Sequence, residues 1–314
     1  MAIFTVGFNP AMDRILECPD FHIGGHQVVR QVARLAAGKA ANVSRALALM
    51  GTDSIAMGFV GTDELELFHN QLMSVGPGRI LCRFIEVTGT TRENITILDP
   101  KRKLETHLRD RGFSVSPSEA KLLEEKLRHE VRAGDVVAFS GSLCEGISPE
   151  FFSLLLDQCA AMGAKLAVDC SGEALKMVAH KQLWLLKPNL EELAVLVGGE
   201  VPNASSAVRD AAAPLTKNIQ HLLVSRGAAG AVLVTAGGSW AARVLNKEAA
   251  VRTVGCGDHL VAAFISELSA GRELTQALRT AMAVATARAL SSRMEEIDMK
   301  DVEAAMGQVA VEEI

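Results

Sequence analysis

The stretch TVGCGD at residues 253–258 runs directly into the apolar segment Leu260–Leu268. This order predicts a glycine-flanked turn that opens a helix and places a carboxylate in its first turn. Free N–H groups at a helix start favour an anion such as a phosphoryl group, and Gly255 and Gly257 have no Cβ to keep it away. Asp258 lies beside that site, where it could accept a proton from an attacking hydroxyl. A glycine turn with an N-capping Asp is the alternative interpretation.

Short apolar runs alternate with helical patterns along most of the chain. Several runs are continuously aliphatic, which is typical of strands buried on both faces of a parallel sheet. The candidate strands are Ile3–Phe8, Ser54–Phe59, Val136–Ser140, Leu166–Asp169, Leu183–Leu186, His221–Ser225 and Ala231–Thr235. Two helix starts, at 116–119 and 148–150, place proline after an N-capping serine. The alternation predicts an α/β fold, a doubly wound and mostly parallel sheet with ligands at the carboxyl ends of its strands.

Two regions break this alternation, at residues 11–34 and 83–111. Both contain alternating patterns such as Arg83–Val87 and Asn94–Ile97, which indicate extra β-strands. These strands could form a small sheet that acts as a lid, or could extend the edge of the main sheet. We expect one domain over residues 1–314, with a discontinuous β-lid from about 11–34 and 83–111.

Composition excludes several classes of protein. The chain has 314 residues, 49% of them hydrophobic, and a formal net charge of −5, which argues against nucleic acid as a partner. Six cysteines occur without a C-x-x-C pair, as expected for reduced thiols in a cytosolic protein. No apolar stretch approaches the roughly 20 residues of a membrane span. We therefore expect a soluble, cytoplasmic protein with no membrane partner.

Two polar groups follow predicted strands in the first part of the chain. Residues 9–13, NPAMD, could hydrogen-bond a polyol through Asp13 or form a plain turn. Residues 38–43, GKAANV, precede a helical pattern, and Gly38 and Lys39 suit an anion there. The segment is not a Walker A loop, because Lys39 is followed by Ala40 and not by Ser or Thr. A lysine on a solvated helix start is the alternative.

Two further groups lie in the second half. Residues 187–192, KPNLEE, contain an expected N-cap at Asn189 with Glu192 as its capping-box partner. A functional interpretation instead places Asn189 and Glu192 near magnesium, with water between the metal and the side chain. Residues 225–230, SRGAAG, could be a plain hairpin or a cradle for nucleotide phosphates. Neither this loop nor the 255–257 turn completes G-x-G-x-x-G, so a nicotinamide dehydrogenase is the disfavoured alternative.

Taken in order, these groups resemble the motifs of the ribokinase-like (PfkB) carbohydrate kinases. Within that family the chain is most similar to the phosphosugar branch, which includes 1-phosphofructokinase and tagatose-6-phosphate kinase. The motifs are found at Asn9–Asp13, Gly38–Val43, Thr91–Asn94, Ser140–Leu143, Asp169–Leu175, Lys187–Glu192, Ser225–Gly230 and Thr253–Asp258. The resemblance runs nearly end to end and implies a ribokinase-like fold with a β-lid, which in relatives often closes the site and sometimes forms a homodimer.

The resemblance also implies a reaction: ATP-dependent phosphorylation of a hydroxyl on a sugar phosphate, with Mg²⁺ and with fructose 1-phosphate or tagatose 6-phosphate as the leading substrates. Asp258 would be the catalytic base, and backbone N–H groups of Gly255, Cys256 and Gly257 would form the anion hole. The implied substrate residues are Asp13, Gly38, Lys39, Asn42, Arg92 and Ser140, with Lys39 and Arg92 meeting the phosphate already on the sugar. The implied nucleotide residues are Lys187, Asn189, Glu192, Ser225, Gly227 and Gly230, with Glu192 serving the metal through water.

Among the departures of the chain from the family pattern, three lie in or beside the site motifs. Cys256 replaces the usual alanine in the anion hole, His259 stands where serine is usual, and Ala40 replaces a glycine. Two other functions therefore stay open beside the proposed one. The first is a kinase of an unphosphorylated sugar or nucleoside, in which Arg92 only pairs within the lid. The second is a catalytically silent protein that binds nucleotide or sugar phosphate as a sensor.

Overall fold

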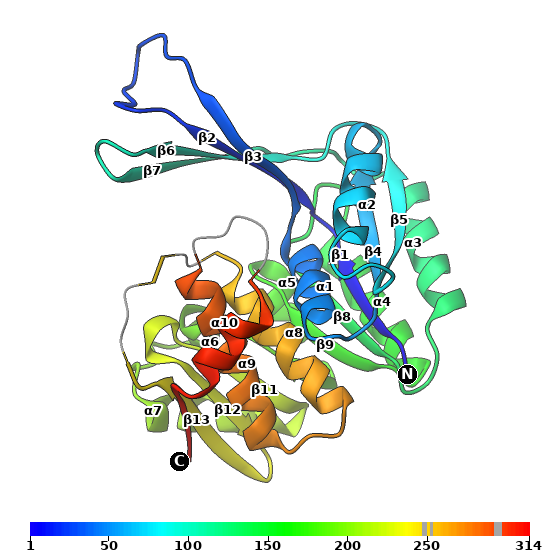
Figure 1. Ribbon diagram of the computed structural model, residues 1–314. Coiled ribbons are helices and arrows are strands. Elements are labelled where there is room, and N and C mark those ends of the chain that lie inside the picture. The colour runs from blue at the N-terminus through cyan, green and yellow to red at the C-terminus, as the bar shows by residue number, and fades with distance from the viewer. Residues whose placement is uncertain (247–249, 252–253, 292–296) are drawn as a thin grey trace.

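The computed structural model describes residues 1–246, 250–251, 254–291 and 297–314. Within these residues the strands form two sheets (Figure 1). From edge to edge, the large sheet consists of β14 (Val309–Glu313), β13 (Gly238–Val244), β12 (Ala231–Thr235), β11 (Ile219–Ser225), β10 (Leu183–Leu186), β9 (Lys165–Asp169), β8 (Val136–Ser140), β1 (Ile3–Gly7), β4 (Ser54–Gly61) and β5 (Ile80–Val87). The small sheet consists of β3 (Arg30–Ala37), β2 (Ala11–Glu17), β6 (Glu93–Asp99) and β7 (Leu104–Arg109).

The large sheet is parallel from β11 to β5, which confirms the predicted doubly wound arrangement. Its central strands are buried on both faces, as β8 is along its whole length, because their side chains are aliphatic on both sides. At the other end, β12, β13 and β14 add an antiparallel extension. The sequence predicts β8, β10 and β12 with the observed bounds, whereas β13 and β14 were not predicted.

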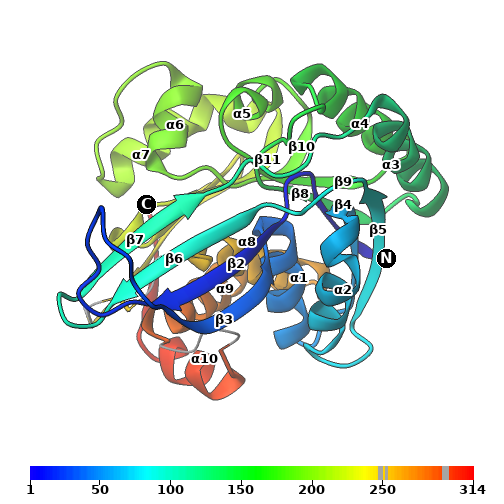
Figure 2. The ribbon, with the colours of Figure 1, turned by 90° about the horizontal axis from the view of Figure 1, so that it is seen from above.

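Helices cover both faces of the large sheet (Figure 2). One face carries α3 (Pro117–Glu130), α4 (Pro149–Ala161), α5 (Glu173–Val178), α6 (Leu190–Val197) and α7 (Ser205–Ala212). The other face carries α1 (Lys39–Leu49), α2 (Leu65–Met73), α8 (Cys256–Ser269), α9 (Leu274–Leu290) and α10 (Met299–Met306). None of the helices in the described residues is long and apolar enough to cross a membrane.

Local sequence signals explain where several helices begin. The Ser116 side chain accepts a hydrogen bond from the backbone N–H of Glu119, and the backbone N–H of Ser116 donates one to the Glu119 side chain, so the predicted capping box is present at α3. The Ser148 side chain caps α4 by accepting from the backbone N–H of Phe151, with Pro149 as the first helical residue. Each such cap stabilises its helix by about 1 kcal/mol. These caps fix the directions in which α3 and α4 leave the sheet.

The small sheet projects from the body of the molecule (Figure 1). Its central strand β2 pairs antiparallel with β3 and parallel with β6. Residues 83–87, expected in this lid, lie instead in β5 of the large sheet, where they pair parallel with β4. That placement corrects the predicted start of the second lid segment. The physical reason is that β5 is an edge strand with alternate residues exposed, so its pattern is the same as that of a half-exposed lid strand.

Candidate active site

The candidate site lies at the carboxyl edge of the parallel strands. Ser140 ends β8, Asp169 ends β9, and Lys187 follows β10 directly. Helices α1 and α8 both begin at this edge, so their N-termini meet the strand ends. Ligands of open α/β sheets bind in this position.

Helix α8 begins as the 253–258 stretch predicts, although residues 252 and 253 lie outside the described ones. Gly255 is the N-cap residue, and its φ of 84° is the left-handed conformation that glycine adopts at little cost. A Cβ on Gly257 would lie 3.5 Å from the Lys187 Nζ atom. The helix start therefore lies next to a lysine ammonium group, an arrangement that attracts phosphate.

Asp258 lies in the first turn of α8 and is only 5% exposed. The Asn42 side-chain amide donates a hydrogen bond of 2.7 Å to its Oδ2 atom. Burial, together with the negative charge of Asp169, raises the pKa of Asp258 to about 6. The Asn42 hydrogen bond and the charges of Lys39 and Lys187 oppose this rise. Asp258 is therefore a stronger base than an ordinary carboxylate and is still ionised at neutral pH.

Lys39, Lys187 and Asp169 form a buried charge cluster beside Asp258. The Asp169 Oδ1 atom lies 2.9 Å from Lys39 Nζ and 3.3 Å from Lys187 Nζ. Burial alone lowers the pKa of Lys39, but the ion pair with Asp169 outweighs it and the net shift is upward, so the ammonium stays charged. The sequence interpretation included Asp169 in a motif but gave it no role. Its place at the end of a buried strand was the signal for one.

The substrate residues expected in the lid make contacts within the protein. Asp13 accepts a 2.8 Å hydrogen bond from the Asn94 side chain, so the two lid strands β2 and β6 are joined. Arg92 donates to the backbone carbonyl oxygens of Asn9 and Pro10, at 3.0 and 3.1 Å. Within the described residues, neither a hydrogen bond nor an ion pair joins Arg92 to Lys39. Arg92 therefore holds the 9–10 turn against the base of the lid.

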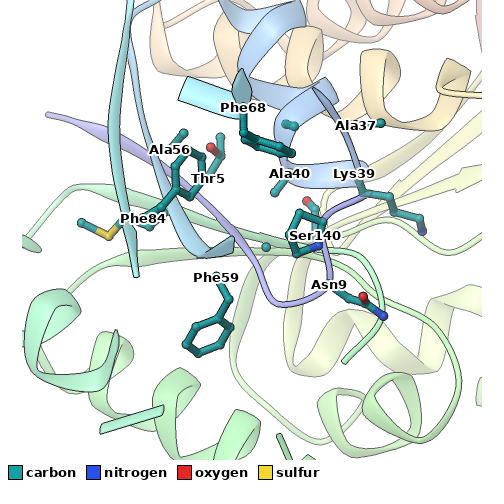
Figure 3. Close-up of a pocket in the computed structure, with 15 residues that line it drawn as sticks. Thr5, Asn9, Ala37, Lys39, Ala40, Ala56, Phe59, Phe68, Phe84 and Ser140 are labelled. Atoms are coloured by element: carbon teal, nitrogen blue, oxygen red, sulfur yellow. The ribbon is translucent and has the colours of Figure 1, made fainter. Parts of the chain in front are cut away.

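A small cavity of about 20 Å³ lies between this turn and α1 (Figure 3). Asn9, Lys39 and Ser140 line one side of it, and Ala56 and Phe84 line the other (Figure 3). Gly38, the N-cap residue of α1, also lines it and has a φ of 112°. Three of the predicted substrate residues, Gly38, Lys39 and Ser140, thus lie around one cavity.

The residues expected to bind the nucleotide, which follow β10 and β11, make hydrogen bonds and turns near their own segments. Asn189 and Glu192 make the reciprocal capping bonds of α6, at 2.7 and 2.8 Å. Ser225 donates its backbone N–H to the Pro188 carbonyl oxygen, which brings the 225–230 loop beside α6. The loop joins the antiparallel strands β11 and β12 as a hairpin. Gly227 has a positive φ of 57°, and a Cβ on Gly230 would lie only 2.0 Å from a backbone oxygen, so glycine is required there.

The three departures from the family pattern have structural consequences. His259 Nδ1 lies 2.9 Å from the Gly255 carbonyl oxygen and must donate to it, so this side chain braces the start of α8. A Cβ on Gly7 would lie 2.9 Å from the Ala40 Cβ, so the larger residue on α1 is matched by glycine on β1. Burial raises the pKa of the Cys256 thiol, against the effect of Arg288. All three substitutions leave the backbone N–H groups of α8 in place.

Arg288 was missed by the sequence interpretation. It lies on α9, and a Cβ on Gly255 would come within 3.7 Å of its Nε atom. A second cation therefore lies beside the helix start, across from Lys187. The sequence around Arg288 has the ordinary pattern of a helix, so nothing in it indicates a residue of the active site.

The residues present fit a magnesium ion held mainly by phosphates. Glu192 supplies a carboxylate near Lys39, and one of its oxygens already accepts from Asn189. Among the described residues, no group of three or more Asp, Glu, His or Cys side chains could enclose a metal. Mg²⁺ commonly uses only one or two carboxylates together with substrate phosphates and water.

Comparisons with known proteins identify the family of this chain. The pfkB family of carbohydrate kinases matches residues 8–296. The 1-phosphofructokinase of Escherichia coli strain K12 is 31% identical over 307 residues, covering 98% of this chain and 97% of the relative. That of Bacillus subtilis strain 168 is 30% identical over 292 residues, covering 93% and 94%. Phosphofructokinase-2 of Escherichia coli, solved with substrates and products, superposes with a TM-score of 0.90 at 24% identity, covering 98% and 99%. The chain belongs to the PfkB family of carbohydrate kinases.

Proposed function

We propose that this protein transfers the γ-phosphoryl group of ATP to a hydroxyl of a ketohexose phosphate. Fructose 1-phosphate is the leading substrate, because the relatives of 30–31% identity are named 1-phosphofructokinase, and tagatose 6-phosphate is the second. One observation carries the proposal: a buried carboxylate, Asp258, lies in the first turn of α8, whose N-terminus lies next to the Lys187 ammonium group. Base and anion site are therefore neighbours, as an attack on phosphorus requires.

Asp258 acts as the base. Its Oδ2 atom is occupied by the Asn42 amide. Oδ1 accepts no hydrogen bond from the described residues, so it can take the proton of the sugar hydroxyl. The pKa of about 6 makes this carboxylate ionised at neutral pH and better able to hold that proton than an exposed one. The proton leaves the hydroxyl as its oxygen bonds to phosphorus.

The start of α8 stabilises the moving phosphoryl group. The N–H groups of Gly255, Cys256 and Gly257 point to where negative charge develops, and Lys187 lies against Gly257. Such preorganised donors cost no rearrangement during the reaction. Asn189 and the Ser225–Gly230 loop, with Gly227 and Gly230 at its turn, would border the nucleotide. When bound, Mg²⁺ would neutralise the phosphates, and Glu192 would hold it through water.

The sugar phosphate would lie between the lid and α1. Asp13, Asn42 and the backbone at Gly38 offer hydrogen bonds to hydroxyl groups. Lys39 is fixed by Asp169 and is charged, and Ser140 lines the same cavity. Arg92, at the base of the lid, would meet the substrate phosphate with N–H groups that its two carbonyl partners do not use, because a guanidinium has five donors.

The test is ADP release from ATP and Mg²⁺ with a panel of fructose 1-phosphate, tagatose 6-phosphate, fructose 6-phosphate, fructose and a nucleoside. We expect the highest kcat/KM with a ketohexose phosphate. Activity on unphosphorylated sugars alone would refute the substrate assignment. Binding of ATP and sugar phosphate without turnover would identify a sensor and refute the enzyme.

We also propose that the lid forms a homodimer in the cytoplasm. Ile23 and Val28 are almost fully exposed, and Leu104 and Leu108 are 60% and 51% exposed on the edge strand β7. An exposed edge with apolar side chains favours pairing with a second copy. Leu108→Lys should lower the mass seen by light scattering to that of a monomer. Leu122→Lys, on the equally exposed α3 surface, should leave it unchanged; a monomeric wild type would overturn the proposal.

A further inference from the structure

A second cavity lies at the amino ends of the parallel strands, whereas the candidate active site lies at their carboxyl ends. Its volume is about 640 Å³, within the range of small-molecule sites. It is formed where β9, β10 and β11 begin, by the turn between β12 and β13, and by the first residue of α9. Lys165, at its rim, and Asp169, in the active site, are four residues apart on β9. Since a strand rises about 3.3 Å per residue, the two sites are about 13 Å apart.

The charge around this cavity is positive. Lys165 and Lys217 line it, and none of the described residues that line it is acidic. The Lys165 Nζ atom lies 5.5 Å from the centroid of the Trp184 ring, a cation–π contact. An anion that pairs with Lys165 would therefore lie beside the indole. Leu274, Ala164 and Ala236, which are partly or fully exposed, provide an apolar surface on the remaining walls.

His221 contributes to the same walls and is 7% exposed. Its ring meets Trp184 edge to face, with centroids 5.8 Å apart, and meets Phe264 of α8 at 6.0 Å. Burial, with the nearby charge of Lys165, lowers the pKa of His221 to about 4, so the ring is neutral at physiological pH. Its Nδ1 atom has no hydrogen-bond partner among the described residues. Buried polar atoms without partners are uncommon, so this one is a feature that packing alone does not account for.

We propose that this cavity binds a small organic anion that carries a flat ring. The anionic group pairs with Lys165 and Lys217, and the ring lies against Trp184 and Leu274. This ligand is not the sugar phosphate or the nucleotide of the reaction, because Asp258 and the start of α8 are at the carboxyl ends of the strands. The composition of the walls fits both parts: two lysines, with no acidic residue among the described residues that line the cavity, for the charge, and an indole with Leu274 for the ring.

Trp184 makes the site directly observable. The chain contains two tryptophans and no tyrosine, so Trp240→Phe leaves Trp184 as the only strong fluorophore. In that background we would titrate phenyl phosphate, inorganic phosphate and benzyl alcohol. We expect a saturable change in Trp184 fluorescence with phenyl phosphate. Charge alone or ring alone should bind at least about tenfold more weakly, since a charge-assisted contact is worth at least that factor.

Two lysine variants locate the binding. Lys165→Gln should weaken phenyl phosphate binding about tenfold, the loss of one charge-assisted contact. Lys181→Gln is the matched control, because Lys181 pairs with Asp157 outside the cavity and its loss should leave binding unchanged. The proposal is overturned if phenyl phosphate gives no saturable change or if both variants behave alike. Equal binding of inorganic phosphate would overturn the assignment of the ring.

Discussion

Replacing Asp258 with asparagine is expected to make the protein more stable and almost inactive. The folded structure raises the pKa of this carboxyl from 3.8 to about 6, which is about two pKa units. One unit corresponds to 1.36 kcal/mol, so the ionised form costs the folded state about 3 kcal/mol. The amide of the variant carries no charge, and its oxygen can still accept the hydrogen bond from Asn42. The variant should therefore recover most of that free energy at neutral pH.

The sign of the pH dependence follows from the direction of the shift. A carboxyl with a raised folded-state pKa stabilises the protein below its unfolded pKa, and this contribution is lost as pH rises to the folded pKa. The loss therefore occurs between about pH 4 and pH 6. Asp258→Asn should gain about 3 kcal/mol over the wild type at pH 7.5 and only about half of that at pH 5.

Urea unfolding at these two pH values measures the gain, and ADP release measures the turnover. Loss of a general base should lower kcat by about 10²- to 10⁴-fold, while ATP still binds. Asp157→Asn is the control, since this exposed residue pairs with Lys181 and should change stability by less than about 1 kcal/mol. A variant of Asp258 that is less stable than the wild type, or whose gain is equal at both pH values, would refute the reasoning. So would near-normal turnover.

Three further predictions concern the same edge of the sheet. The wild-type kcat/KM should fall tenfold per pH unit below about pH 6, as Asp258 becomes protonated. Lys187→Met should move this fall to higher pH, because the Lys187 ammonium lowers the pKa of Asp258. A wild-type kcat/KM that falls only near pH 4 would contradict this. Gly255→Ala should lose about 1–2 kcal/mol of stability and most turnover, whereas Gly134→Ala, at the same φ of 84° but far from the site, should lose only the stability. Cys256→Ala should keep near-normal turnover, and the Cys256 thiol of the wild type, whose pKa is raised, should react slowly with iodoacetamide; rapid inactivation would disprove this.

The sequence alone predicts the parallel part of the fold because its signals are local. Continuous aliphatic runs identify β8 and β10 with their observed bounds, and serine–proline pairs identify the starts of α3 and α4. The strand β14 gives no such signal, because its last residues are Glu312 and Glu313, which are exposed at the sheet edge. Edge strands such as β5 and β14 have one solvent-exposed face, so their sequences do not predict which sheet they join.

The sequence predicts which residues belong to the site, but it does not predict which of them contact one another. Asn42 and Asp258 are 216 residues apart, and only the meeting of α1 with α8 brings them to 2.7 Å. Arg288 reaches Gly255 from the last turn of a helix whose pattern is that of a core element. Motif order identifies residues that touch ligands in a family. It does not identify the partners that set their charge.

The four charges at the centre of the site explain why the base can be buried. Lys39 and Lys187 are positive, Asp169 and ionised Asp258 are negative, and the sum is zero. Asp169 shares one oxygen between both lysines, so it holds two cations at the edge where phosphates must arrive, and its own charge raises the pKa of Asp258. Removing Asp169 would leave two lysines with Asp258 as their nearest carboxylate. That carboxylate would then be an ordinary ion-pair partner, with a lower pKa and less capacity to take a proton. Asp169 thus positions the two lysines and also keeps the pKa of Asp258 raised.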